Sequence, residues 1–304
     1  MSKKNSCLLC ILLFILVSYS FTACGETERE DEVNEPQKEV HVDDDINDVD
    51  PIQDIEEWFT VLCSPELGGR YSGSEGIGKA VDYILDIIGR SDSLEIDTFD
   101  TYKGEMKNII FHIKGECDSL VVLGAHYDAF GYNNKIALPG ADDNMSGVAV
   151  LLRVIRLLQG AKMTPRYNLD VCFWDGEEIG RFGSKMYVQN KKDYKHMSYI
   201  NVDTVGNDEY YTVTLTYSPE YAFCTHIFDE FVNELGMPMA EYNPQGFTTD
   251  CEPFIREHIP FINICCDKIP PYLHKNTDVP SNISYSKIND LANAIIKYLI
   301  DFKL

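Results

Sequence analysis

Five short motifs rich in Asp, Glu and His constrain the fold of this chain more than any other feature, because four of them directly follow apolar segments. In chain order they are Gly124–Asp128, Gly140–Asn144, Asp175–Glu178, Asn201–Asp203 and His274–Asp278. Polar side chains that follow an apolar run are typical of strand ends, and ligands of α/β proteins bind at the carboxyl ends of strands. The motifs are therefore expected to meet at one edge of a sheet.

The segments around the motifs alternate between strand-like and helical patterns. Strands are expected at Leu94–Tyr102, Asn108–Lys114, Leu120–Ala125, Tyr167–Trp174, Tyr199–Val205, Tyr211–Tyr217 and Pro260–Cys265. Helices are expected at Ile52–Cys63, from an N-cap at Ser74 to about Ile88, and at Met145–Leu158, Phe182–Gln189, Pro219–Leu235 and Ile288–Phe302. This alternation predicts an α/β fold, a three-layer sandwich around a mixed, mostly parallel sheet.

The charge of the chain excludes one class of partner. Its 304 residues are 44% hydrophobic, which supports a sizeable core, and the formal net charge is −23. Because phosphate binding needs a basic face, nucleic acid is not an expected partner. Residues 25–50 hold 12 acidic and 2 basic residues and almost no apolar periodicity. Residues 24–51 are therefore expected to be an acidic, disordered tether in front of a domain at 52–304.

Residues 1–23 have the pattern of a signal peptide. Two lysines precede the apolar run Cys7–Val17, which is too short to span a bilayer comfortably. The following Phe21–Gly25 resembles the lipobox of bacterial lipoproteins, although Phe21 stands where Leu is usual. The resemblance implies cleavage before Cys24, lipid on its thiol and a place in the cell envelope, with an outer-membrane lipoprotein favoured. A secreted protein and an uncleaved anchor are the alternatives.

The five motifs supply the side chains that a two-zinc hydrolase needs. Zinc binds imidazole nitrogen and carboxylate oxygen, and a catalytic zinc site keeps one position open for water. Two zinc ions a few ångström apart can hold and activate one hydroxide between them. The motifs contain two histidines, carboxylates able to bridge two ions and a spare Glu, which fits this chemistry.

Three further segments carry a resemblance to a known family. They are Gly69–Arg70, Gly73–Ser74 and, most specific of all, Glu177–Ser184. With the five motifs, they make the chain similar to the zinc aminopeptidases of metallopeptidase family twenty-eight, the group with bacterial leucyl aminopeptidase, over about residues 55–303. The resemblance implies two zinc ions as cofactors. It also implies that the substrates are peptides with a free N-terminus, from which single residues are removed.

The same resemblance implies five metal ligands, one from each motif: His126, Asp142, Glu178, Asp203 and His274. Asp142 would bridge the two zinc ions, with its neighbour Asp143 in a supporting role. His126 would share its zinc with Asp203, and His274 would bind the other zinc. The motif around Asp142 also suits the N-cap and acidic first turn of the following helix, and the two roles can coexist.

Glu177 and Glu178 are expected to have different tasks. Adjacent side chains of a regular strand point to opposite faces, so a bend is expected here. By resemblance Glu178 binds zinc, whereas Glu177 takes a proton from the attacking water and gives it to the leaving amine. Asp128 follows His126 by two residues and would point the same way along an extended chain. There it would accept the other imidazole N–H and fix the tautomer.

The last motif departs from the family pattern. Lys275 stands where Thr is usual, and Leu273 stands where an aromatic residue is common. Tyr272 is therefore a candidate for polarising the scissile carbonyl, with simple packing as the alternative.

Two other functions remain open at this point. One is a glutaminyl-peptide cyclotransferase with one zinc, an enzyme class that resembles this family. The other is a catalytically inactive binding domain of the same fold. The chain has no insertion directly after Glu177–Glu178 and only two tryptophans, which favours the peptidase over the cyclotransferase. No implied ligand position is broken, which disfavours an inactive domain.

Overall fold

A computed structural model of the chain describes residues 50–191, 196–207, 213–217, 239–240, 249–266 and 268–301. The signal peptide, Cys24 and the acidic tether as far as residue 49 lie outside these ranges, as does the helix expected at Pro219–Leu235, whereas Asp50 and Pro51 at the end of the tether lie inside them. No helix of the described part is both long enough and apolar enough to cross a membrane.

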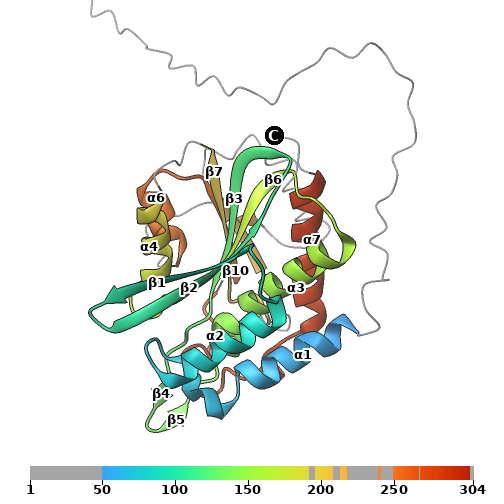
Figure 1. Ribbon diagram of the computed structural model, residues 1–304. Helices are drawn as coiled ribbons and strands as arrows, with labels where there is room; N and C mark the ends of the chain where they lie inside the picture. The colour runs from blue at the N-terminus through green and yellow to red at the C-terminus, as the bar shows by residue number, and fades with distance from the viewer. Residues whose placement is uncertain are drawn as a thin grey trace, which may run out of the picture. The chain divides into compact units, whose positions relative to one another are not determined.

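Eight strands form one mixed sheet in the order β1-β2-β6-β3-β7-β10-β8-β9 (Figure 1). Their bounds are β1 Leu94–Thr101, β2 Gly104–Ile113, β3 Cys117–His126, β6 Tyr167–Trp174, β7 Met197–Asp203, β8 Val213–Tyr217, β9 Met239–Ala240 and β10 Phe261–Cys266. The pairs β6–β3, β3–β7, β7–β10 and β8–β9 are parallel. The pairs β1–β2, β2–β6 and β10–β8 are antiparallel, so the predicted mixed, mostly parallel sheet is confirmed.

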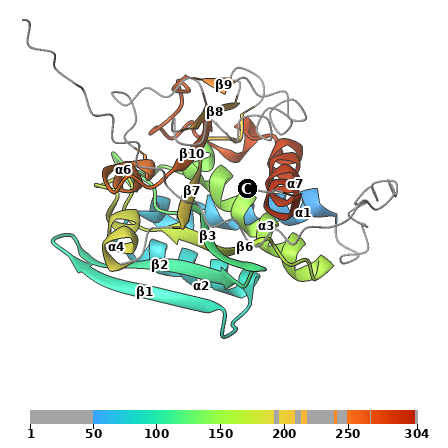
Figure 2. The same cartoon turned by 90° about the horizontal axis from the view of Figure 1, so that it is seen from above.

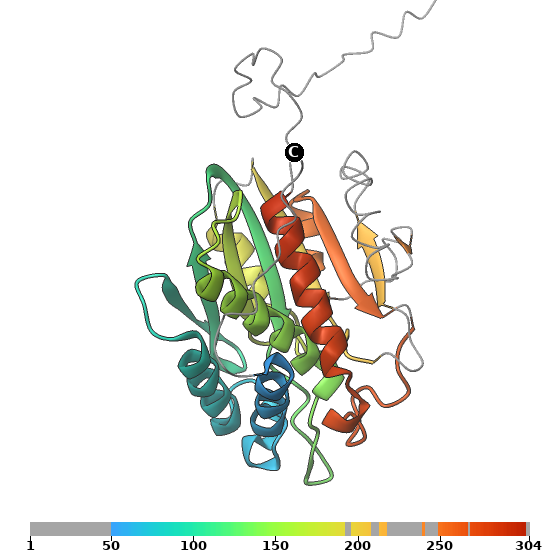
Figure 3. The same cartoon turned by 90° about the vertical axis from the view of Figure 1, so that its right-hand side faces the viewer.

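Helices cover both faces of this sheet (Figures 1 and 2). On one face lie α1 (Pro51–Leu62), α2 (Glu75–Ile88), α3 (Ser146–Ala161) and α7 (Tyr285–Asp301), which Figure 3 shows in front of the strands. On the other face lie α4 (Phe182–Asn190) and α6 (Cys251–Arg256). The two faces have separate cores, and the predicted three-layer sandwich is confirmed.

The central strands explain why both faces must be covered. In β3, Val121 and Leu123 belong to the core under α3 and α7, whereas Val122 belongs to the core under α4 and α6. Every residue of β6 except Asn168 is buried. Strands that read as near-continuous apolar runs are stable only where both faces are covered. The carboxyl ends of β3, β6 and β7 are thereby fixed as a rigid edge.

Most elements lie where the sequence predicts them, with differences at the ends. The helix predicted from Ile288 begins one turn earlier, at Tyr285. The elements that were not predicted include the 3-10 helix η1 (Pro65–Arg70), the helix α6, and a two-stranded hairpin of β4 (Tyr132–Asn133) and β5 (Ile136–Ala137). These are short and polar or aromatic, so that they carry little hydrophobic periodicity.

One buried arginine joins the loops that lead to the sheet edge. Arg70 is 1% exposed, and its guanidinium donates hydrogen bonds to four main-chain carbonyls. The acceptors are Leu62, Tyr127, Pro139 and Gly140, at 2.6, 2.9, 2.7 and 2.9 Å. Tyr127 lies inside the first motif and Gly140 begins the second, so one side chain fixes the backbone of both.

Arg70→Lys is expected to lower the free energy of unfolding by about 2 kcal/mol, because a single ammonium cannot serve four carbonyls in the planar fork geometry of arginine. Chemical denaturation monitored by circular dichroism would measure the change. Arg256→Lys is the matched control. Arg256 is an exposed partner of Glu252 on α6, where the same substitution should stay within about 0.5 kcal/mol. Equal losses in the two variants would contradict the role given to Arg70.

Candidate metal centre

One carboxylate, that of Asp143, lies between the two motif histidines. Its Oδ1 is 3.2 Å from His126 Nε2, and its Oδ2 is 2.8 Å from His274 Nε2. Asp203 Oδ1 lies 3.8 Å from the same His126 nitrogen. Glu178 Oε2 lies 3.7 Å from the same His274 nitrogen. Each histidine therefore has a carboxylate of its own and shares Asp143 with the other histidine.

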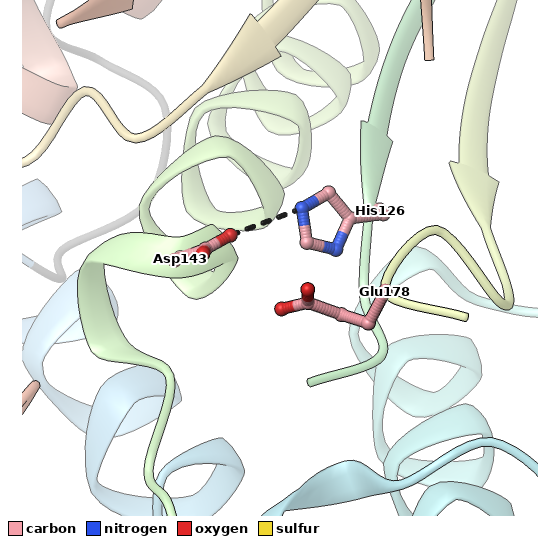
Figure 4. A group of neighbouring side chains, drawn as sticks. All are labelled: His126, Asp143 and Glu178. Carbon is pink, nitrogen blue, oxygen red and sulfur yellow. Dashed lines mark ion pairs between the residues drawn. The ribbon is translucent and has the colours of Figure 1, made fainter. Parts of the chain in front are cut away.

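The tightest group of possible metal ligands in the described part of the chain is formed by His126, Asp143 and Glu178. One ligand atom from each lies within 4.8 Å of the other two. Figure 4 shows both carboxylates approaching the His126 ring. Their proximity brings together three of the five motifs.

The carboxyl edge of the sheet presents these side chains, as the sequence predicts. His126 is the last residue of β3 and Asp203 is the last residue of β7. Glu178 follows β6, and His274 lies in the loop after β10. Asp143 comes from a kinked segment, Ala141–Met145, that leads directly into α3. Five segments far apart in the sequence therefore converge at one place.

The structure contradicts the expectation that Asp142 is the shared carboxylate. Asp142 Oδ2 accepts a hydrogen bond from the Tyr272 hydroxyl at 2.6 Å, and Oδ1 accepts one from the Gly206 amide at 2.8 Å. The backbone at Asp143 is not helical, with φ −113° and ψ 92°, so adjacent side chains diverge. Asp143, and not Asp142, occupies the position between the histidines. The Tyr272 hydroxyl is committed to Asp142, and its predicted role in polarising a carbonyl gains no support.

Asp278, from the last motif, fixes the kinked segment. Its two carboxylate oxygens accept the main-chain amides of Asp142 and Asp143 at 2.8 and 3.2 Å. The side chain is 1% exposed. A buried acid thereby satisfies two amides of a segment that cannot satisfy them itself, which keeps Asp143 in place.

Glu177 and Glu178 lie in a bend after β6, as the sequence predicts. Gly176 has a φ of 77°, which favours glycine, and the Glu177 carbonyl accepts the amides of Gly180 and Arg181 at 3.0 Å each. The amides of Glu177 and Glu178 donate to the Asp128 carboxylate at 3.0 and 3.3 Å. Asp128 therefore fixes the backbone from which both Glu side chains project.

Asp128 also faces His126, although its main-chain oxygen is the nearer acceptor. His126 Nδ1 lies 3.1 Å from the Asp128 carbonyl oxygen and 3.5 Å from Oδ1. In a metal-binding histidine, a hydrogen bond at the ring nitrogen that does not bind the metal fixes the tautomer. With Nδ1 engaged by Asp128, Nε2 is the nitrogen that points at Asp143 and Asp203.

The centre concentrates the negative charge of three carboxylates, those of Asp143, Glu178 and Asp203. Across the described ranges, no Lys or Arg makes an ion pair with Asp143, Glu178 or Asp203. Burial raises the pKa of Glu177 and that of Glu178 well above the ordinary range. Buried carboxylates are costly unless a cation compensates them. Imidazole nitrogens beside carboxylate oxygens are the ligands that zinc takes, so the donor set fits zinc.

A pocket opens beside the shared carboxylate. It is lined by Ala129, Phe130, Leu138, Gly140, Asp143, Glu178, His274, Lys275 and Asp278. The Phe130 ring packs on the His274 ring, with 4.0 Å between their centroids. The two tryptophans of the chain, Trp58 and Trp174, are buried in the two cores, so neither lines this pocket.

The sequence interpretation did not predict the structural roles of four residues: Asp143 as the shared carboxylate, and Ser72, Asp175 and Asp278 as supporting residues. Three of them lie inside the motifs, so their membership of an acidic motif was the available signal. Ser72 lies in the loop between η1 and α2 and had no signal of its own, because it meets the centre only through the fold.

Comparison with known proteins places this geometry in a family. The model of peptidase family M28 matches residues 108–299. Leucine aminopeptidase 2 of Trichophyton equinum is 28% identical over 168 residues, which cover 50% of this chain and 32% of that protein. The match thus spans about a third of the length of this leucine aminopeptidase.

Two solved structures share the fold. A zinc aminopeptidase from Bacillus subtilis has a TM-score of 0.56 at 22% identity, covering 66% of this chain and 52% of that one. A glutaminyl cyclase from Tannerella forsythia has a TM-score of 0.64 at 18% identity, covering 83% of this chain and 99% of that one. Identity this low establishes the fold alone. Because the family model covers more than half of its 304 residues, the chain belongs to peptidase family M28.

Proposed function

We propose that the protein is a zinc-dependent aminopeptidase that holds two zinc ions and hydrolyses the N-terminal residue of peptides. The observation that carries the proposal is the Asp143 carboxylate between His126 and His274, each with a further carboxylate beside it. This arrangement offers each of two ions three protein ligands, the number typical of a catalytic site that also binds water. The similarity to a leucine aminopeptidase supports the reaction class.

Glu177 is the general base of the proposed reaction. Zinc in this donor set would polarise the peptide carbonyl and lower the pKa of a water molecule. Glu177 takes a proton from the attacking water and returns it to the leaving amine. Burial raises the pKa of Glu177 above the ordinary range, so its carboxylate binds a proton more strongly than an exposed carboxylate does. The Asp128 carboxylate accepts a hydrogen bond from the main-chain N–H of Glu177 and so fixes the backbone position from which the Glu177 side chain projects.

Negative charge at the centre accounts for the proposed preference for a free N-terminus. The substrate ammonium would find carboxylates that no Lys or Arg of the described residues neutralises. An acetylated N-terminus has no charge to offer and would leave such a carboxylate unpaired, which is costly in a buried site. Peptides with a free amine are therefore the proposed substrates, with an apolar first residue as the first choice to test.

The decisive measurement combines a metal count with a substrate panel. Under saturating zinc, the purified protein should bind two zinc ions per chain, lose activity with a chelator and regain it with zinc. Mass spectrometry of a peptide digest should show products shortened one residue at a time from the N-terminus, while the acetylated peptide stays intact.

Other outcomes would identify the rival functions. One zinc per chain together with loss of ammonia from an N-terminal Gln would indicate a glutaminyl-peptide cyclotransferase. Zinc binding without turnover of any peptide would indicate a binding domain. Internal cleavage or C-terminal trimming would contradict the aminopeptidase proposal directly.

The proposal for the location is a lipoprotein of the cell envelope, at the outer membrane, with lipid on Cys24. Its support is the sequence Phe21–Gly25 behind an apolar run. Cys24→Ser should release the protein from the membrane fraction or leave the precursor uncleaved, because stable anchoring needs the acyl chains. Fractionation followed by immunoblotting measures this. The same substitution at Cys7, inside the apolar run, is the control and should leave fractionation unchanged.

A further inference from the structure

Next to Asp128 lies a second buried carboxyl group, that of Asp175. The Ser72 hydroxyl oxygen is 2.8 Å from Asp175 Oδ1 and 3.2 Å from Asp128 Oδ2, so a serine stands between two acids. Asp128 is 0% exposed and Asp175 is 2% exposed. The three residues come from the loop before α2, the end of β3 and the end of β6. The proposed reaction gives no role to Asp175 or Ser72.

Hydroxyl hydrogens are too few for the contacts around Asp175. The Tyr127 hydroxyl lies 2.7 Å from the Lys107 carbonyl oxygen and 3.3 Å from Asp175 Oδ2, and Ser72 makes the two contacts given above. Each hydroxyl has one hydrogen. With both acids ionised, two hydrogens would therefore serve four oxygen–oxygen contacts.

One additional proton on Asp175 Oδ1 resolves this shortage. Asp175 then donates to Ser72, Ser72 donates to Asp128, and Tyr127 donates to the Lys107 carbonyl. These are the three shortest of the four contacts, and only the 3.3 Å approach of Tyr127 to Asp175 stays without a hydrogen. The other carboxyl oxygen, Oδ2, is left free to accept the Lys107 amide at 3.1 Å.

The surroundings decide which of the two acids holds the proton. Asp128 accepts two main-chain amides, those of Glu177 and Glu178, whereas Asp175 accepts one, that of Lys107. Hydrogen bonds to a carboxylate favour its charged form, and the Asp175 carboxyl receives fewer of them from the main chain. The proton accordingly belongs on Asp175.

The charges that face Asp175 agree with this assignment. From the end of β3 it faces the Asp128 carboxylate and the Tyr127 hydroxyl, and from β2 it faces only the Lys107 amide. The Lys107 ammonium pairs with Glu105 instead, and no Lys, Arg or His of the described chain makes an ion pair with Asp175. Burial, and then the charge of Asp128, raise the pKa of Asp175 to about 7.

We infer that Asp175 is held as a neutral carboxylic acid and is a positioning residue that acts on Asp128 through Ser72. Asp128 in turn faces His126 and holds the amides of Glu177 and Glu178. The chain of hydrogen bonds therefore connects Asp175 with one histidine and with the backbone of the general base. The role of Asp175 in positioning the general base rests on the proposed function. The protonation of Asp175 and its effect on zinc affinity can be measured without any substrate.

The first test compares zinc affinity in the full-length protein by competition with a chelating dye. Asp175→Ala and Ser72→Ala should weaken zinc binding by about 10- to 100-fold, as expected when the partner of a metal ligand is disturbed. Asp175→Asn should restore most of the affinity. Its amide nitrogen can donate to Ser72, and its carbonyl can accept from Lys107, as the neutral acid does. Loss of affinity in Asp175→Asn equal to that in Asp175→Ala would overturn the inference.

The second test follows Tm against pH in excess zinc, which separates a neutral acid from a needed charge. The pKa of Asp175 rises from its ordinary 3.8 to about 7 in the folded chain, so the folded state holds the proton more tightly than the unfolded state. Stability is therefore lost as pH rises towards 7 and stays low above it. Asp175→Asn removes this loss, and its Tm should exceed that of the wild type by a margin that widens from about pH 4 to about pH 7 and is constant above that.

Asp170→Asn is the matched control with the opposite sign. Asp170 is also buried, but although burial opposes its ionisation, hydrogen bonds from His112 and Tyr187 lower its pKa. Its charge stabilises the fold above the ordinary pKa of an Asp, so Asp170→Asn should lower Tm at neutral pH. An Asp175→Asn protein that behaves like Asp170→Asn would overturn the inference. Infrared spectroscopy gives a further measurement if the Ala variants fold poorly. A band of a protonated carboxyl group that is present in the wild type and absent in Asp175→Asn would support the inference.

Discussion

Replacing Glu177 with Gln should lower kcat by about 10²- to 10⁴-fold, because the side-chain amide of Gln cannot accept a proton from the attacking water. Zinc should stay bound in this variant. The substitution keeps the shape of the side chain, and the main-chain N–H of residue 177 can still donate its hydrogen bond to the Asp128 carboxylate. Steady-state kinetics on an aminoacyl anilide, together with metal analysis of the same preparation, would measure both quantities.

The neighbouring residue supplies the matched control for this experiment. Glu178→Gln changes the same side chain one position later, beside His274. It should weaken zinc binding, and excess zinc should recover part of its activity. A normal kcat in Glu177→Gln, or an equal loss of zinc in the two variants, would show that the two tasks have been assigned wrongly.

Asp143→Ala should lower zinc affinity by more than about 100-fold, since it removes the carboxylate that faces both histidines. Changes to residues that only support a metal ligand typically cost up to about 100-fold. Activity should fall with the metal content. Isothermal titration with zinc and a count of bound ions would measure the loss.

Asp142→Asn tests the neighbouring acid, for which we expect the smaller loss of zinc affinity. Its carboxylate oxygens accept hydrogen bonds from Tyr272 and Gly206, and an amide keeps one acceptor for them. Zinc affinity should therefore fall far less than in Asp143→Ala. If the order of the two effects were reversed, Asp142 would be the bridging ligand after all.

The fold and the location of the centre could be predicted from the sequence because both depend on local patterns. Apolar runs such as Val121–Leu123 form strands that helices must cover, and polar residues at their carboxyl ends then share one edge. Family resemblance alone suggested that His126 shares its zinc with Asp203 and that His274 binds the other zinc. The structure brings His126 within 3.8 Å of Asp203, and it adds that Glu178 lies 3.7 Å from His274.

The choice between Asp142 and Asp143 could not be made from the sequence, because it depends on backbone angles in one kinked segment. Adjacent acids have the same chemistry, and the non-helical conformation at Asp143 and Asn144 decides which one faces the histidines. That conformation depends on Asp278, which accepts the amides of both acids from more than a hundred residues away in the chain. No local pattern carries this information.

Supporting contacts such as Ser72 to Asp175 escaped prediction for a related reason. The two residues are 103 positions apart, and the serine belongs to a loop whose course is fixed by the buried Arg70. A serine in a polar loop has no periodicity or spacing to distinguish it. Such contacts become visible only when the loops are placed in three dimensions.

The two halves of the metal centre differ in their access to water. His126 is 1% exposed, whereas half of the His274 side chain, 50%, is exposed at the pocket. An ion held by His274 and Glu178 should therefore exchange with solution faster than an ion held by His126 and Asp203. A mild chelator would strip the outer position first and leave the inner one filled. Zinc content measured after ordinary purification would then record how the protein was handled, and only titration to saturation would report how many ions it can hold.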